Sequence, residues 1–170
     1  MVKGLKKTSE TIAIGFSVDE SAANTYTQGS VDLNLDPLNN EVFVVVAINL
    51  DPFFPDALAA TNTRVRAGLT TTSQTAMPEL NNSNCLARST NQIQAQGFAD
   101  GGVAFQQSSM DTPPATLDYL GIIATNDFFV QVQGDSNNVA KGVDGKLYGY
   151  RARADASIYA ALVQSEVLSA

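Results

Sequence analysis

The sequence contains no histidine and no tryptophan, and it has a single cysteine. Without histidine the chain cannot build a Ser-His-Asp triad, and most zinc sites lose their usual ligand. Cys85 has no second cysteine to pair with, which excludes the disulfide-rich secreted classes, and no neighbouring base would activate its thiol. We therefore predict that the protein is not an enzyme and that none of its residues is catalytic.

Charged residues are also scarce. They make up 16% of the chain and are outnumbered by the 50 Asn, Gln, Ser and Thr residues. Straight-chain charged residues usually coat helices, whereas Thr and Ser favour strands and turns. The net charge of −7 argues against nucleic-acid binding by the body of the chain, because phosphate contacts need clustered Lys and Arg. The composition predicts an all-β protein without specific nucleic-acid binding.

Long hydrophobic runs and ligand-binding motifs are missing as well. The longest apolar run, Val42 to Ile48, is too short for a transmembrane segment, and no signal peptide is recognisable at the start. The segment "ADGGVAF" lacks the Lys-Ser/Thr ending of a phosphate loop. Asp135, Asn137 and Asp144 do not have the spacing of a calcium loop. We expect no cofactor and no metal site within the chain, and a calcium ion between subunits stays an open alternative.

Alternation of apolar and polar residues indicates several half-buried strands. It is clearest in "TIAIGFSV", "TRVRAGL" and "DFFVQV", while the β-branched run "EVFVVVAINL" is typical of a strand buried on both faces. Asp-Pro, Asn-Asn and the Asp144-Gly145 pair mark turns. About eight such strands predict one antiparallel β-sandwich of jelly-roll type over residues 9–170, after a short basic arm over residues 1–8. An immunoglobulin-like sandwich is the rival, but its cysteine and tryptophan hallmarks are missing.

The closing segment "GYRARADASIYAALVQSEVLSA" fits two structures. Read as a strand, it places Tyr150, Ala154 and Ile158 on one face, and we expect that strand to pair with the first one. Read as a helix, it aligns Ile158 with Leu162 and offers Asp155 as the N-cap. The regular alternation favours the strand, so we expect few helices or none, with a helix here as the alternative.

Several exposed-looking residues are candidates for contacts with other subunits. Two phenylalanines stand between prolines in "DPFFPD", where they either cap the core or anchor a neighbouring subunit. Two Arg-x-Arg pairs each present both guanidinium groups on one strand face, which indicates either a solvated edge or ion pairs between subunits. The lysines of "MVKGLKK" form either a frayed end or an arm that reaches a neighbour, an acidic surface or packaged nucleic acid. The candidate interface residues are therefore Phe53, Phe54, Arg64, Arg66, Arg151, Arg153, Lys3, Lys6 and Lys7.

Three stretches give the chain a general likeness to a known family: "MVKGLKKTSETIAIGFSV", "EVFVVVAINLDP" and "KLYGYRARADASIYAALVQSE". With them the chain resembles the small single jelly-roll capsid proteins of icosahedral DNA viruses. The resemblance implies a structural protein that self-assembles as a capsid subunit of a virus particle. It also implies a homo-oligomer (a trimer, pentamer or hexamer), other capsid proteins as partners, and a virion location after synthesis in the host cytoplasm.

Two other functions compete with the capsid interpretation. A β-sandwich binding module for carbohydrate or a receptor, such as a virion spike or fibre domain, would share the fold. Sugar sites usually present exposed Trp or Tyr platforms, and this chain has five tyrosines and no tryptophan. A cupin-type enzyme is also a jelly roll, but its metal site cannot be built without histidine. The sequence therefore favours assembly over binding, and binding over catalysis.

Overall fold

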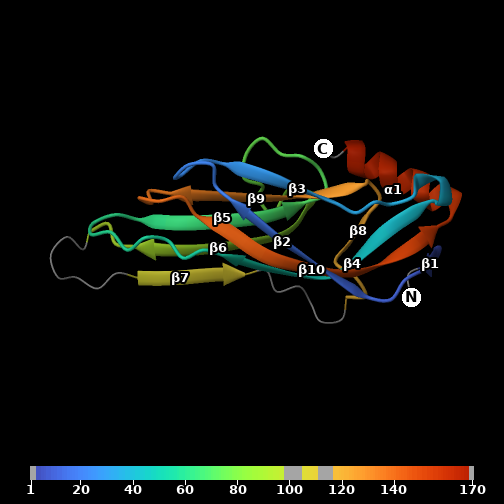
Figure 1. The fold of residues 1–170 in the computed structure, drawn as a ribbon, viewed down its shortest axis with the longest axis horizontal. Helices are drawn as coiled ribbons and strands as arrows, with labels where there is room; N and C mark the ends of the chain where they lie inside the picture. The colour runs from blue at the N-terminus through green and yellow to red at the C-terminus, as the bar shows by residue number, and fades with distance from the viewer. Residues whose placement is uncertain (1–2, 98–104, 111–116, 169–170) are drawn as a thin grey trace.

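Two five-stranded antiparallel sheets form a sandwich (Figure 1). The computed structural model describes residues 3–97, 105–110 and 117–168. The strands are β1 (Leu5–Lys7), β2 (Ile12–Asp19), β3 (Thr27–Asp32), β4 (Glu41–Pro52), β5 (Thr63–Thr70), β6 (Cys85–Gln94), β7 (Phe105–Met110), β8 (Gly121–Ile123), β9 (Asp127–Asp135) and β10 (Gly142–Ala154). A short 3-10 helix, η1 (Pro37–Asn39), and the helix α1 (Ala156–Leu168) complete the fold. The expected all-β sandwich is confirmed.

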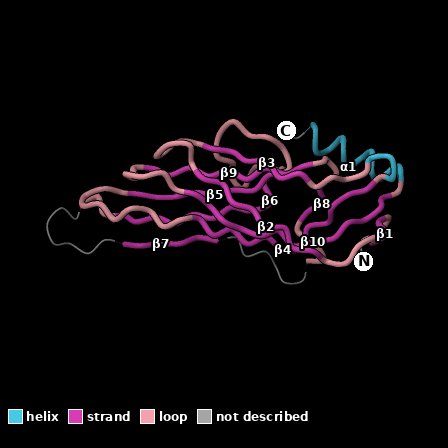
Figure 2. The backbone as a smooth tube through the Cα atoms, viewed as in Figure 1, coloured by secondary structure: helices cyan, strands magenta, loops and turns pink. Residues whose placement is uncertain are grey.

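Strand β10 forms the centre of the first sheet, called sheet A here. On one side β10 pairs with β4, and β4 pairs in turn with β8. On its other side the beginning of β10 pairs with β2 and its end pairs with β1, so that Ile12 lies opposite Gly149 and Leu5 lies opposite Ala154. The second sheet, sheet B, has the strand order β3-β9-β5-β6-β7. Figure 2 shows how strands make up most of the molecule, with α1 at one end.

The core lies between the two sheets and follows the alternation in the sequence. In β5 the inward residues Val65, Ala67 and Leu69 are fully buried, as their spacing predicted. The rings of Phe16 and Phe128 meet edge to face across the core, with centroids 5.9 Å apart. Side chains from both sheets therefore form one apolar layer, which is what holds a β-sandwich together.

The end of the chain corrects the prediction of a continuous strand. The alternation correctly predicts a strand as far as Ala154, where β10 ends. The helix α1 then begins, with the backbone C=O of Asp155 accepting the N–H of Tyr159 at 2.8 Å. Apolar side chains at helical spacing, among them Ile158 and Leu162, pack over the outer face of sheet A. Alanine favours a helix over a strand, and a helix also covers this face of sheet A, so these two effects outweigh the alternation. No helix among the described residues is long and apolar enough to cross a membrane.

Three further boundaries differ from the sequence-based expectation. Asp144 and Gly145 do not form a turn but lie inside β10, and the chain turns earlier, at Ser136, whose φ is 61°. Strand β4 continues to Pro52, opposite Val143. Residues 5–7 of the expected basic arm form β1 and pair with β10.

Candidate functional site

The candidate interface residues lie in three regions. Arg151, Arg153 and the three lysines gather at the end of the sandwich that carries α1, because β1 pairs with the last residues of β10. The phenylalanine loop follows Pro52 at the opposite end, since Pro52 pairs near the start of β10. Arg64, at the start of β5 in sheet B, lies toward the same end as this loop, because Asn137 bonds both the carbonyl oxygen of Arg64 and the N–H of Asp56. The structure therefore does not bring the three groups together into one site.

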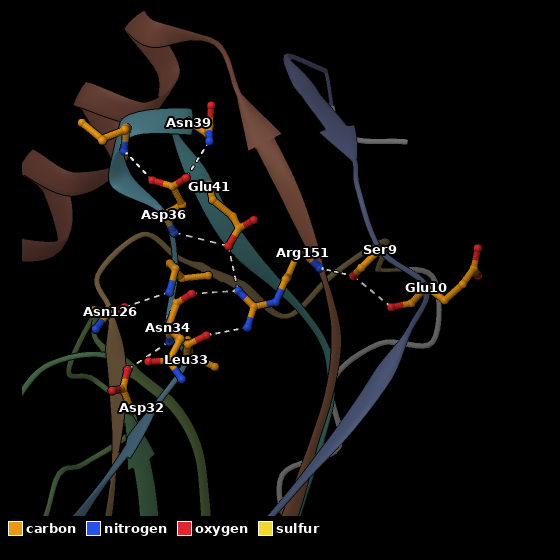
Figure 3. A network of polar contacts seen from close by, with 12 residues as sticks. Ser9, Glu10, Asp32, Leu33, Asn34, Asp36, Asn39, Glu41, Asn126 and Arg151 are labelled. Carbon is orange, nitrogen blue, oxygen red and sulfur yellow. Dashed lines mark hydrogen bonds and ion pairs between the residues drawn. The ribbon is translucent and has the colours of Figure 1, made fainter.

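Arg151 closes the α1 end of the sandwich (Figure 3). Its Nη1 donates to Glu41 Oε1 at 2.7 Å and to the carbonyl oxygen of Asn34 at 3.2 Å. Its Nη2 donates to the carbonyl oxygen of Leu33 at 2.5 Å. The same Glu41 oxygen accepts the backbone N–H of Asp36 at 3.3 Å. One guanidinium from sheet A thus holds the segment that leaves β3 of sheet B, and its carboxylate partner belongs to its own chain.

Lys6 and Arg153 form a cationic spot at the same end. The two residues lie directly opposite each other in the β1–β10 ladder, and both are exposed. Arg153 Nη2 donates to Asn39 Oδ1 at 3.3 Å. Lys7 lies over the ring of Tyr150, with Nζ 4.9 Å from the centroid. Glu41 lies opposite Arg153 on the other side of β10, but its carboxylate is paired with Arg151. Lys6 and Arg153 therefore keep an excess of positive charge, which favours the approach of an anionic group.

Arg64 and Arg66 share one carboxylate. Arg64 Nε is hydrogen-bonded to Asp135 Oδ2, and Arg66 Nε lies 3.3 Å from the same oxygen. Arg66 also donates to Gln133 Oε1 at 3.2 Å, and partial burial lowers the pKa of its guanidinium. A shallow hollow of about 330 Å³ lies beside this cluster, lined by Asn62, Thr63, Arg64, Gln92, Ile93, Gln94 and Asp135. Paired charges of both signs therefore border this hollow.

Phe53 and Phe54 expose 42% and 44% of their surface, whereas the flanking Pro52 and Pro55 are buried. The prolines and the backbone hold the loop against the sandwich, since the Phe53 N–H donates to the carbonyl oxygen of Gly142 at 2.8 Å. The aromatic side chains are therefore only partly used by the core of their own chain. They offer apolar surface at the loop end of the sandwich.

A buried polar network below this loop escaped the sequence analysis. The carboxylate of Glu20 accepts three backbone N–H groups, including those of Gly134 at 3.0 Å and Lys141 at 2.8 Å. Asn137 Oδ1 accepts the N–H of Asp56 at 2.9 Å, and Lys141 Nζ bonds Asp56 at 2.8 Å, which lowers the pKa of that carboxyl group. These partners are up to 121 residues apart in the chain, so no local pattern could reveal them.

The structure also bears on possible metal ligands. Asp135 is engaged by arginine, Asn137 by backbone groups, and Asp144 lies exposed within β10. Among the described residues, no group of three or more Cys, Asp or Glu side chains could hold a metal ion. Cys85 is half-buried, and its thiol lies 3.4 Å from the carbonyl oxygen of Ala87.

Comparison with known proteins gives no relative from which a function could be transferred. No protein-family model matches the chain, and neither a curated protein nor a solved structure matches it.

Proposed function

We propose that this chain is a structural protein: a self-assembling jelly-roll capsid subunit of a virus particle, located in the virion. The observation that carries the proposal is the strand order of the two sheets. Four strands of sheet A follow the order β2-β10-β4-β8, and four of sheet B follow β3-β9-β5-β6. Jelly rolls are eight-stranded double sheets built from two Greek keys, and viral capsids use them widely.

Consecutive strands that alternate between the sheets support the jelly-roll assignment. The chain passes from β2 in sheet A to β3 in sheet B, back to β4, and again to β5. Strands β8, β9 and β10 repeat the alternation in the second half of the chain. Each sheet therefore combines strands from both halves, as two interlocked Greek keys require.

Surface character supports assembly. The half-exposed phenylalanines offer the kind of aromatic anchor in which interface energy concentrates. The cationic spot at Lys6 and Arg153 stands out on a chain of net charge −7, so an acidic region of another subunit is a suitable partner. We propose homo-oligomers (trimers, pentamers or hexamers), with other capsid proteins as further partners.

Light scattering coupled to gel filtration, with negative-stain microscopy of the same sample, tests the proposal. We expect rings, shells or one defined oligomer. The double variant Phe53→Ser/Phe54→Ser is expected to reduce assembly, whereas Leu38→Ser, which changes a 91% exposed residue at the other end, is the matched control. A clean monomer at high concentration, alone and with acidic partner capsid proteins, would contradict self-assembly and favour a carbohydrate- or receptor-binding module.

A further inference from the structure

The free edge of β2 has the features of a contact between two copies of this chain. Strand β2 pairs only with β10, so one of its sides carries backbone groups that no strand pairs with in the described part of the chain. At eight residues it is long for an edge strand, and Asp19 is its only charged residue. Edge strands usually avoid pairing with other chains through charges, proline or short length. Strand β2 has little of this protection.

The outward backbone groups belong to small, exposed residues. The N–H of Glu20 donates to the carbonyl oxygen of Lys141 directly opposite, at 2.8 Å. Because hydrogen-bonded pairs alternate along an antiparallel ladder, every second residue counted back from Glu20 bonds to β10. The residues between them include Ala13, Gly15 and Ser17, and their N–H and C=O groups therefore point away from β10. All three residues are exposed. A strand from another molecule can therefore reach these groups without meeting a bulky side chain.

Gly15, at the middle of β2, has no reason to be glycine in the contacts of the residues that the structure describes. A Cβ built there meets nothing within 4 Å, and its φ is not in the positive region. Every other glycine of the described residues either has a positive φ or would bring a Cβ against a neighbouring atom. Glycine weakens a strand interior, and such a position often marks the close approach of another backbone or a ligand.

The core-facing side of β2 is incompletely covered. Ile12 is 39% exposed, and Ile14, Phe16 and Val18 are only partly buried although they face the core. By contrast, the inward residues of β5 are fully buried. A further strand added beside β2 would extend sheet A and cover these apolar side chains.

The sequence of β2 is self-complementary about Gly15. A two-fold axis perpendicular to the sheet places residues opposite each other only if their side chains lie on the same face. With the axis at Gly15, Gly15 faces its own copy and Ala13 faces Ser17 of the other copy. In the same register Ile14 faces Phe16, so that apolar side chains meet apolar ones on the inner side. No like charges are opposed within the paired strands.

We propose that two copies of this chain associate through antiparallel β2–β2 pairing centred on Gly15, which joins their A sheets into one. This inference deepens the proposed function, because it names a contact for assembly and rests on that function for the role of the contact. The partner is a second copy, since the pattern of the strand matches itself.

Paired charge variants test this register. Ala13→Lys/Ser17→Lys places two pairs of like charges across the contact, and we expect the dissociation constant, measured by sedimentation velocity, to rise about tenfold. Ala13→Lys/Ser17→Glu changes the same two positions but places opposite charges across the contact. We expect this variant to associate as tightly as the unchanged chain. Ser17→Pro removes an outward N–H but none that bonds to β10, so it should weaken association without unfolding the subunit.

Amide exchange of Ala13, Gly15 and Ser17 gives a second measurement. Their N–H groups should become protected as protein concentration rises, and thermal unfolding confirms that each variant folds. If the unchanged chain assembles but both lysine-containing variants assemble equally well, the β2 contact is wrong while the proposed function stands. If the unchanged chain alone stays monomeric at every concentration, the β2 contact fails, and if it also stays monomeric with acidic partner capsid proteins, the proposed function fails as well.

Discussion

Arg151 and Glu41 lie diagonally across the β4–β10 ladder, since Arg151 is opposite Phe43 and Glu41 is opposite Arg153. The diagonal pairing turns the guanidinium toward the open end of the sandwich, where it also bonds the carbonyl oxygen of Leu33. The ion pair itself lies within sheet A, and the same guanidinium fastens sheet A to the segment that leaves sheet B through its bonds to the carbonyl oxygens of Leu33 and Asn34. Arg151 stabilises the fold mainly through this bridge, because an isolated ion pair at the surface contributes little to the free energy of unfolding.

Replacing Arg151 should loosen this end of the molecule. Arg151→Met keeps the apolar stem but removes every donor, which leaves a half-buried carboxylate and two carbonyl oxygens without their partner. We expect the free energy of unfolding to fall by about 2 kcal/mol, measured by urea denaturation. Arg153→Met, on the same strand face but exposed, should change it by less than about 0.5 kcal/mol. Equal effects of the two variants would refute the bridge.

Asp135 should matter more than an average surface carboxylate. It neutralises both Arg64 and Arg66, and the Arg66 side chain is only 13% exposed. Asp135→Asn keeps the shape but leaves two neighbouring guanidinium groups without a counter-charge, so we expect a loss of about 1–2 kcal/mol in urea denaturation. Asp144→Asn, exposed on β10, is the matched control and should be near neutral. A neutral Asp135→Asn would show that solvent already screens the cluster.

The helix α1 is fastened by a buried carboxylate, and its attachment should depend on pH. Glu166 accepts the N–H of Ala124 at 2.9 Å and the hydroxyl of Thr125 at 2.5 Å, and burial raises its pKa above the ordinary value. The folded state therefore binds a proton at a higher pH than the unfolded chain does. The contribution of this group to stability is greatest at and below the ordinary glutamate range, and it declines as the pH rises through the raised pKa.

Two variants isolate the role of Glu166. Glu166→Gln keeps an acceptor for Ala124 and removes the charge, so its stability advantage over the unchanged chain should be largest near neutral pH and shrink on acidification. Glu166→Ala leaves the Ala124 N–H without its acceptor and should cost about 1–3 kcal/mol. Denaturation curves at several pH values measure both. A difference between the Gln variant and the unchanged chain that stays constant with pH would contradict the assignment.

The sequence predicted those features of the fold that depend on one strand at a time. Alternation identified β2 and β5 because apolar side chains such as Val65 and Leu69 pack in the core, whereas small or polar residues such as Ser17 alternate with them. The same rule failed after Ala154, where alternation continues by chance through an alanine-rich stretch. Val42 and Val44 lie on the outer face of sheet A, where an apolar element must cover them. The sequence of the closing segment alone does not show this requirement.

The candidate site was predictable only as a set of residue types. The Arg-x-Arg spacing correctly placed both guanidinium groups of each pair on one strand face. Their partners could not be read from the sequence, because Glu41 is 110 residues from Arg151 and Asp135 is 71 residues from Arg64. The other acceptors of Arg151 are backbone carbonyl oxygens, which no residue type reveals. The Asp144-Gly145 pair was wrongly predicted as a turn from its residue types. Gly145 instead allows close packing within the sheet, because a Cβ there would lie 2.6 Å from the carbonyl oxygen of Asn49.

Gly149 and Gly15 make a matched pair for testing why glycine occurs in sheet A. A Cβ at Gly149 would lie 2.3 Å from the carbonyl oxygen of Val44 and 2.5 Å from the ring of the fully buried Phe43. Neither neighbour can move freely, so Gly149→Ala should destabilise the fold by about 2 kcal/mol and lower Tm by roughly 4–8 °C. Gly15→Ala has open space and should be neutral or slightly stabilising in the isolated subunit. Thermal unfolding at low protein concentration measures both effects, and a neutral Gly149→Ala would mean that the bulge between Tyr148 and Gly149 relaxes to admit the methyl group.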